Sequence, residues 1–340
     1  MANVTIKTMK TPRHAYFRQV AAAVPPHGGT IRDQLLEATI NKDAYQTLFD
    51  DFHGDSLHDM YTLKEDTGAT TVAASTAILA SSASNDKYAG FTGGDLGWFG
   101  GKNCMFQTRC KITSTAFTET KYEFGWHGAV AGSAGLFNDI AAPSWVGTTA
   151  GVLFGYDSDD TAEIVWKAGA YSSAAPKKRN LYNTGTSTAA AATTLTQASY
   201  TWIVNAFGGL WVTAGTAPNL TRAKIVTNTA TVLTVVGWDN GTPAAASTYV
   251  ISNFYEKGTA AHSPTIPHLN WYHTYTIKIE QLMALFYIDG VQVAAIPAAV
   301  AATTTGLTPW FFAQARGTGA VDASLTVDYL QCIQSRDVTA

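Results

Sequence analysis

Three charged side chains alternate along one short predicted strand, at Glu119, Lys121 and Glu123. Because successive side chains of a strand point to opposite faces, residues two apart share a face. Two carboxylates on one face are the groups that glycoside hydrolysis requires, one as nucleophile or base and one as acid. Here a lysine stands between them and would pair with them. We therefore expect an exposed Glu–Lys–Glu strand face and assign no catalytic residue.

A second acidic cluster, Asp157-Ser158-Asp159-Asp160 with Glu163, offers oxygen ligands of the kind that Ca²⁺ accepts. The cluster lacks the Asp-x-Asp-x-Asp-Gly order of a loop that wraps the ion. We expect a solvated turn between two strands and no metal site.

The remaining nucleophiles and ligands have no motif around them. The eight histidines show neither HxH nor HExxH spacing, and the Gly-rich stretches lack the lysine of a phosphate-binding loop. The three cysteines, Cys104, Cys110 and Cys332, have no CxxC spacing. We expect them to be reduced and buried, with a disulfide or metal clip as the alternative. No cofactor is predicted.

Aromatic side chains offer one further binding chemistry, because exposed rings suit the C–H faces of sugars. In a β protein of this length such residues more often form the core. A core and a sugar-binding platform are thus the two interpretations. The candidate rings are Trp98, Phe99, Trp126, Trp145 and Tyr156.

The composition excludes several classes of partner. Of 340 residues, 14% are charged and 46% hydrophobic, and the net charge is −3. These values differ from those of a disordered chain or a nucleic-acid binder. No segment approaches the roughly 20 apolar residues that span a bilayer, and the N-terminus lacks a signal-peptide pattern. We expect a cytosolically made chain with no nucleic-acid or membrane partner.

The elements that position these residues are predicted to be strands. Aromatic residues, threonine and valine are abundant, and they fit a pleated, half-buried surface. Short runs of alternating polarity between Gly, Asn, Asp and Pro are typical of an antiparallel sandwich or barrel. Asp289-Gly290 predicts a type I′ hairpin between two of these runs. The predicted strands are 104–113, 119–127, 151–156, 162–168, 273–280, 284–288, 291–296, 309–315 and 323–334.

The N-terminal part differs from the rest. Residues 1–47 carry a net charge of +3, are broken by paired prolines and glycines, and contain one predicted helix over 31–37. Residues 49–66 carry −5. The opposite charges suggest that the arm of one copy lies on the body of another, with two solvated surfaces as the alternative.

A change of strand rhythm marks an insertion. Residues 187–200 are rich in Thr, Ala and Ser and predict a linker or exposed loop. Five shorter strands follow within 201–255, the first at Trp202-Ile203-Val204, and we expect them to close a small barrel. The predicted organisation is an arm over 1–47, a body formed by 48–200 and 256–340, and an inserted β domain over 201–255.

Three segments in order resemble the concanavalin A-like lectin/glucanase superfamily, which includes laminin-G-like modules and many phage proteins. They are Phe49-Asp50-Asp51-Phe52-His53-Gly54, Trp271-Tyr272-His273-Thr274-Tyr275-Thr276-Ile277 and Phe286-Tyr287-Ile288-Asp289-Gly290-Val291. A final strand such as 325–330 follows them in that superfamily. The resemblance implies a jelly-roll β-sandwich; hydrolases of the superfamily carry Asp where this chain has Lys121. The stretch 223–251 resembles small β modules of phage structural proteins.

These observations predict a non-enzymatic structural protein of a phage-like virion, most simply a capsid decoration or cement protein held by its arm. Its predicted partners are virion proteins such as the major capsid protein, and copies of itself in a symmetric homo-oligomer. A carbohydrate-binding module for receptor recognition is the alternative, and a polysaccharide hydrolase a less favoured one.

Overall fold

The computed structural model describes part of the chain. Residues 1–44 lie outside the described residues, and with them most of the predicted arm and the helix predicted over 31–37. The described residues are 45–93, 97–114, 119–128, 135–138, 144–145, 150–158, 166–171, 177–180, 184–199, 201–215, 219–252, 270–280, 282–297, 299, 306–317 and 321–335.

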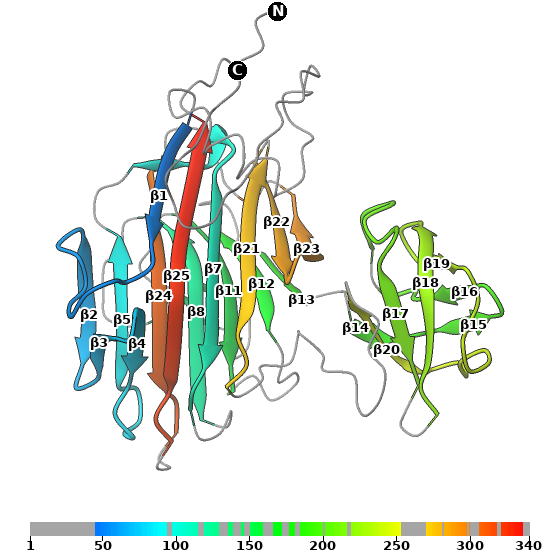
Figure 1. The fold of residues 1–340 in the computed structure, drawn as a ribbon, viewed down its shortest axis with the longest axis horizontal. Helices are drawn as coiled ribbons and strands as arrows, with labels where there is room; N and C mark the ends of the chain where they lie inside the picture. Colours follow the sequence, from blue (N-terminus) through cyan, green and yellow to red (C-terminus); the bar gives the residue numbers. More distant parts are fainter. Residues whose placement is uncertain are drawn as a thin grey trace, which may run out of the picture.

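Two antiparallel eight-stranded sheets form the body (Figure 1). In sheet A the order is β23-β22-β21-β7-β25-β4-β3, with β1 also paired to β25. Its strands are β23 (Val291–Ile296), β22 (Met283–Ile288), β21 (His273–Glu280), β7 (Met105–Ile112), β25 (Ser324–Ser335), β4 (Thr76–Ala80), β3 (Ala69–Ala73) and β1 (Tyr45–Asp50).

In sheet B the order is β13-β12-β11-β8-β24-β5-β2, with β6 also paired to β24. Its strands are β13 (Lys177–Asn180), β12 (Lys167–Tyr171), β11 (Gly151–Asp157), β8 (Thr120–His127), β24 (Gly306–Ala315), β5 (Tyr88–Gly93), β2 (Tyr61–Asp66) and β6 (Trp98–Phe99). A 3-10 turn, Gly100–Lys102, follows β6, and β9 (Phe137–Asn138) pairs with β10 (Ser144–Trp145).

Aromatic rings fill the space between the two sheets. Alternation along β8 sends Tyr122, Phe124 and Trp126 inward, and all three are fully buried. The Phe124 ring of sheet B meets the Tyr275 ring of sheet A edge-on, at 4.8 Å between centroids. This all-β sandwich confirms the predicted fold class.

Most of the predicted strands of the body are present within one or two residues. The hairpin is also confirmed, since β22 pairs with β23 and Asp289 and Gly290 have φ of 51° and 81°. Such positive angles are what a type I′ turn requires. Of the strand predicted over 162–168, the structure describes the end, where β12 begins at Lys167.

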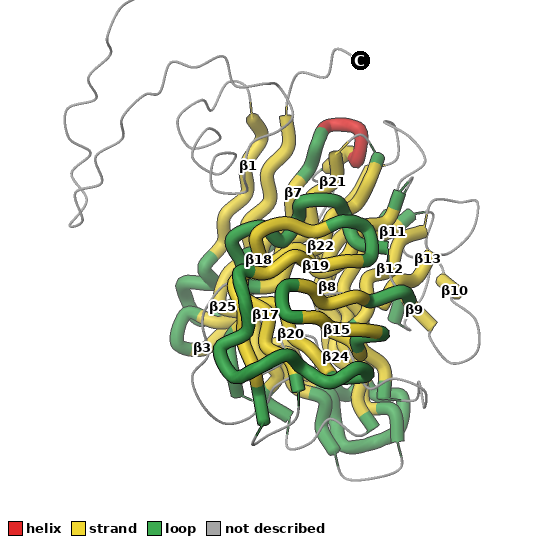
Figure 2. Tube along the Cα trace, turned by 90° about the vertical axis from the view of Figure 1, so that its right-hand side faces the viewer, coloured by secondary structure: helices red, strands yellow, loops and turns green. Residues whose placement is uncertain are grey.

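A third sheet of seven strands lies beside the sandwich, next to β13 and β23 in Figure 1, and it faces the viewer in front of the sandwich strands in Figure 2. Its order is β14-β20-β17-β18-β19-β16-β15. The strands are β14 (Thr184–Thr186), β20 (Thr248–Ser252), β17 (Trp211–Ala214), β18 (Thr221–Asn228), β19 (Val232–Val235), β16 (Thr194–Thr196) and β15 (Ala189–Ala191).

Two predictions about this region are wrong. The linker predicted over 187–200 contains β15 and β16, because Leu195 is buried opposite Leu233 of β19 and ties the Thr- and Ala-rich segment into the sheet. The strand predicted at Trp202 does not form. Trp202 instead packs its ring edge-on against Phe207 and Tyr249 and is buried as part of the core of the third sheet.

Within the described residues, no helix is long and apolar enough to cross a membrane.

Candidate functional site

The candidate site is the face of sheet B that points away from the sandwich core. Residues of β8 that alternate with the core rings, Lys121, Glu123 and His127, lie on this face, and all three are buried. Buried ionisable side chains are rare unless they are paired. Their partners therefore define what this face does.

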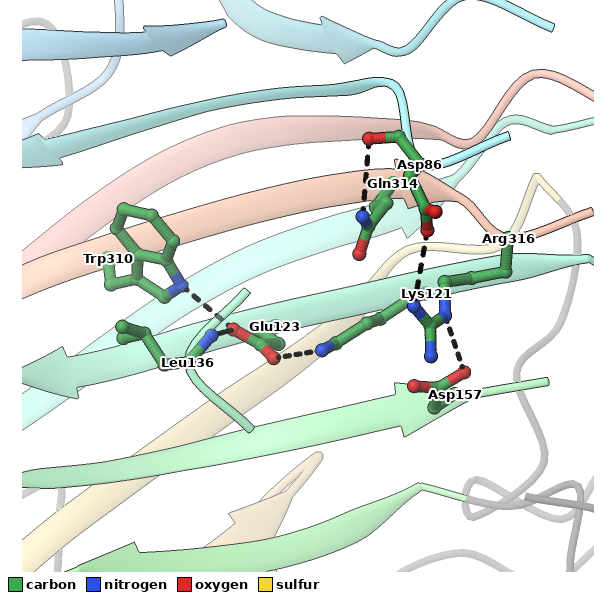
Figure 3. Close-up of polar contacts among 8 residues, drawn as sticks. All are labelled: Asp86, Lys121, Glu123, Leu136, Asp157, Trp310, Gln314 and Arg316. Atoms are coloured by element: carbon green, nitrogen blue, oxygen red, sulfur yellow. Dashed lines mark hydrogen bonds and ion pairs between the residues drawn. The ribbon is translucent and has the colours of Figure 1, made fainter. Parts of the chain in front are cut away.

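Lys121 and Glu123 form an ion pair, with 3.0 Å between Nζ and Oε1 (Figure 3). The second carboxylate oxygen, Oε2, accepts hydrogen bonds from the backbone N–H of Leu136 at 2.7 Å and from the indole Nε1–H of Trp310 at 3.2 Å. Both oxygens of Glu123 are thus engaged, and its side chain has no exposed surface. The carboxylate is fixed in place and shielded from water.

A second hydrophobic cluster covers the pair. It consists of Tyr88, Leu136, Leu153, Trp310 and Phe312, and Leu136 comes from the segment after β8. Gly135 lies so close that a Cβ there would stand 2.7 Å from Lys121 Nζ and 2.8 Å from Glu123 Oε1. The chain's own residues 135–136 therefore occupy the surface of sheet B above Glu123.

The prediction of an exposed Glu–Lys–Glu face is therefore wrong. Glu119 lies in a turn before β8, with φ of 58°, so the strand alternation does not extend to it. Lys121 and Glu123 do share a face and do pair, as their spacing indicates. They are buried because residues 135–136 fold back over them, and nothing in the local pattern signals that cover.

A second polar network lies near the start of β8 and reaches from the buried Asp157 to the exposed Asp86. Asp157, the last residue of β11, accepts a bond from Arg316 Nε at 3.3 Å, and the same guanidinium reaches Asp86 at 3.4 Å (Figure 3). Gln314, on β24 beside Lys121, donates to the Asp86 carbonyl at 3.3 Å. The network joins the ends of three strands.

The predicted solvated turn at Asp157 is thus wrong, because this residue belongs to β11 and is buried against Arg316. The other acidic residues of that cluster, Asp159, Asp160 and Glu163, lie outside the described residues. Among the residues that the structure does describe, no group of three or more His, Cys, Asp or Glu is placed to hold a metal ion.

His127 lies at the other end of β8, on the same face as Lys121 and Glu123. Its Nδ1–H donates to the Gly128 carbonyl, and its Nε2 lies 2.7 Å from Thr92 Oγ1, so the neutral ring accepts a hydrogen bond from the Thr92 hydroxyl. The ring also meets Trp310 edge-on at 5.1 Å. Burial lowers the pKa of His127 to about 4, and the positive charge of Lys64 acts in the same direction.

We expect His127 to make stability depend on pH. Its folded pKa lies below its unfolded value, so the fold is favoured above the unfolded pKa and loses that contribution as pH falls toward about 4. Between pH 7 and pH 5 the wild type should lose about 2 kcal/mol more of its free energy of unfolding than His127→Gln. Urea titrations of both proteins at the two pH values measure this difference. Equal losses would mean that His127 is protonated in the fold.

The cysteines are where the sequence predicts them. Cys104, Cys110 and Cys332 are free and buried, and burial raises the pKa of each thiol well above its usual value. Each therefore stays a thiol, which agrees with a packing role.

Three of the five candidate sugar-binding aromatics belong to the core. Trp98, Trp126 and Tyr156 are buried, which favours the core interpretation for them. Phe99 is half-buried, and the side chain of Trp145 lies outside the described part of the structure. These residues do not form an exposed platform together.

Comparisons with known proteins show no family for this chain. No family model matches the chain, and no curated protein matches its sequence. Among similar solved structures, the carbohydrate recognition domain of Emp47p has 7% identity and a TM-score of 0.44, covering 86% of this chain and 97% of that one. A Bacillus licheniformis beta-glucanase has 7% identity and a TM-score of 0.42, covering 84% and 96%.

A phage protein is also among these structures. The CBM2 module of the evolved Dit of Lactobacillus casei BL23 phage J-1 has 10% identity and a TM-score of 0.39, covering 87% of this chain and 99% of that one. These similarities are weak, with TM-scores of 0.39 to 0.44, and the two-sheet sandwich itself is established by the strand pairing of this chain. Identities this low transfer neither ligand nor activity.

One prediction is corrected by these neighbours. The chain was expected not to be an enzyme, yet a galactohydrolase, two glucanases and a transglycosylase are among the proteins of similar structure. At 7–11% identity they do not show that this chain has an activity. The presence of Lys121 between Glu119 and Glu123 is therefore insufficient ground for excluding catalysis.

Proposed function

We propose that this chain is a structural protein of a virion and that it decorates the capsid by binding the major capsid protein through its N-terminal arm. The observation that carries this proposal is the way in which the first described strand is built into the body. An arm that holds a protein on a lattice must transmit force to the core, and β1 provides that connection.

β1 is paired along its whole length with β25. The antiparallel register runs from Tyr45 opposite Ser335 to Asp50 opposite Leu330. β25 also pairs with β7 and β4, so β1 joins the interior of sheet A. Pulling the arm would shear a full ladder of backbone hydrogen bonds, which break together.

Side chains reinforce this attachment. Tyr45 packs on Met105 and Ile333, and Leu48 packs on the main core. The side chain of Gln334 donates to Gln46 Oε1 at 2.7 Å. Residues 45–47, which the sequence pattern assigns to the arm, are therefore part of the body, and residues 1–44 are left as the attaching segment.

The charge of the arm supports binding to another protein. Its excess of basic residues and its few scattered apolar residues cannot build a core, and such a segment gains order by lying on a partner. Residues 135–136 cover the face of sheet B above Glu123, so this part of the face is not open to a ligand. The proposed contacts with the capsid lie elsewhere on the molecule.

Deletion of residues 1–44 tests the proposal. We expect the truncated protein to have the melting temperature of the wild type, because β1 is retained. When it is added to particles that were assembled without this protein, it should fail to attach. Wild-type attachment should weaken as salt screens the charges of the arm. Occupancy can be measured by imaging decorated particles.

A longer deletion provides the control. Removing residues 1–50 also removes β1, so this protein should melt at a lower temperature than the shorter truncation. If the protein that lacks only residues 1–44 still decorated particles at full occupancy, the attachment would lie on the body. The proposal that the arm binds the capsid would then be wrong.

A further inference from the structure

The connection between β19 and β20 contains an exposed turn, Asp239-Asn240-Gly241. It holds the one Asn-Gly pair in the 340-residue chain. Gly241 has φ of 82°, and a Cβ at this position would have no atom within 4 Å. Because glycine has no Cβ, its backbone nitrogen is less hindered than that of any other residue toward the side chain that precedes it.

Hydrogen bonds hold this turn against the start of β18. The Arg222 N–H donates to Asp239 Oδ1 at 2.6 Å, and the Asp239 N–H donates to the Arg222 carbonyl at 2.9 Å. The Thr221 hydroxyl donates to the Gly241 carbonyl at 2.9 Å and accepts from the Asn240 N–H at 3.3 Å. We call this set of contacts the turn latch.

The two groups of an Asn-Gly reaction are uncommitted in this turn. Within the described part of the chain, the Gly241 N–H donates no hydrogen bond. The Asn240 side chain is exposed, and its Nδ2 donates to the Leu220 carbonyl at 3.2 Å. Because the nitrogen and the side-chain carbonyl carbon belong to neighbouring residues, their reaction is unimolecular and needs no partner to be bound.

We propose that Asn240 is a site of spontaneous deamidation, and that the reaction releases the turn latch. The Gly241 nitrogen gives its proton to hydroxide and attacks Cγ of Asn240. The new C–N bond closes a succinimide ring, the bond from Cγ to Nδ2 breaks, and ammonia leaves with a proton from water. Water then opens the ring at either carbonyl, which yields aspartate or isoaspartate.

Neither product can rebuild the latch. A carboxylate at residue 240 faces the Leu220 carbonyl, and two acceptors repel each other where a donor and an acceptor stood. The new negative charge also lies beside Asp239. In isoaspartate the backbone is one methylene longer, so the Gly241 carbonyl no longer meets the buried Thr221 hydroxyl. The turn should therefore separate from β18.

The hairpin turn Asp289-Gly290 provides a contrast within the same chain. Asp289 Oδ1 accepts from the Thr274 N–H at 2.9 Å, and Oδ2 lies 2.6 Å from His273 Nδ1. Both oxygens are thus held by other segments, and a carboxylate has no leaving group comparable to ammonia. We expect no isoaspartate at this turn, so the reaction is confined to Asn240.

Incubation of the full-length protein at mildly alkaline pH tests the reaction. Peptide mass spectrometry should find Asn240 converted to a mixture of aspartate and isoaspartate. The rate should rise about tenfold per pH unit, because the attacking nitrogen must first lose its proton. Asn219 is also exposed but precedes Leu220, so it should react at least about tenfold more slowly.

Two variants separate the reaction from its consequence. Gly241→Ala places a Cβ beside the attacking nitrogen and should slow the reaction at least about tenfold, with thermal melting as the check that it is folded. Asn240→Gln keeps an amide but should stay unmodified. Amide hydrogen exchange at Arg222 and Asp239 reports on the latch. After incubation it should be faster in the wild type and unchanged in Asn240→Gln.

Four outcomes would overturn the assignment of the reaction. They are an Asn240 that stays intact while a synthetic peptide of residues 236–247 deamidates, equal rates at Asn240 and Asn219, an unchanged rate in Gly241→Ala, or a product with aspartate alone. Unchanged hydrogen exchange after full conversion would overturn the release of the latch. Because no particle is present, none of these outcomes bears on attachment by the arm.

Discussion

Replacing Lys121 by methionine is expected to lower the free energy of unfolding by about 3–5 kcal/mol, because it removes the ammonium group that pairs with the buried Glu123 carboxylate. The donors Leu136 N–H and Trp310 Nε1–H bind the other oxygen of the carboxylate. They cannot replace the charge at the oxygen that Lys121 faces. Urea titration measures the loss.

The double variant Lys121→Met/Glu123→Gln should recover much of that loss. It removes both charges, and the glutamine carbonyl still accepts from the Leu136 and Trp310 donors. Glu123→Gln alone leaves the buried ammonium and should again be costly. The coupling free energy from the four proteins isolates the pair from the packing changes.

An exposed ion pair serves as the matched control. Lys87 and Asp66 lie 3.1 Å apart with side chains that are 33% and 43% exposed. Lys87→Met should therefore cost only about 0–1 kcal/mol. If Lys121→Met were equally mild, Glu123 would have to be hydrated, and residues 135–136 would not cover it in solution.

The second large effect is expected at Gly125, in the middle of β8. This residue has φ of 147°, and a Cβ would stand 2.4 Å from the Val152 carbonyl oxygen and 2.7 Å from the Leu153 Cα. These are backbone atoms of the paired strand β11, so they cannot rotate away. Gly125→Ala should cost about 3–5 kcal/mol from overpacking and an unfavourable φ together.

Gly54→Ala separates those two contributions. Gly54 has a similar φ of 132° and no atom within 4 Å of a Cβ position. Its substitution should cost about 1–2 kcal/mol, which is the backbone contribution alone. A Gly125→Ala protein no less stable than Gly54→Ala would show that β8 and β11 are able to separate at low cost. Thermal and urea unfolding of both variants decide between these results.

The sequence predicts the local elements well because their signals are local. Alternating polarity has the period of the pleat, so the bounds of β7, β21 and β23 follow from it within a residue or so. The turn at Asp289-Gly290 depends only on two residues that tolerate positive φ. The pairing of Lys121 with Glu123 likewise follows from their spacing along one strand.

The third sheet shows where composition misleads. Residues 187–200 have few apolar side chains, so they resemble a linker. The single buried Leu195, opposite Leu233, is enough to recruit β15 and β16, because backbone hydrogen bonds supply the rest of the pairing. Such recruitment depends on a neighbouring strand 38 positions away, which no local window contains.

The sequence by itself determined most strands of the body, which side chains of a strand share a face and, through the resemblance of three segments, that the body is a β-sandwich. Only the tertiary structure decided which faces are covered. Glu123 is buried because Gly135 and Leu136 return over it, whereas Phe49 and Trp271 remain exposed on sheet A. The period of a strand separates two faces without specifying which one meets solvent, and burial depends on contacts between segments that are distant along the chain.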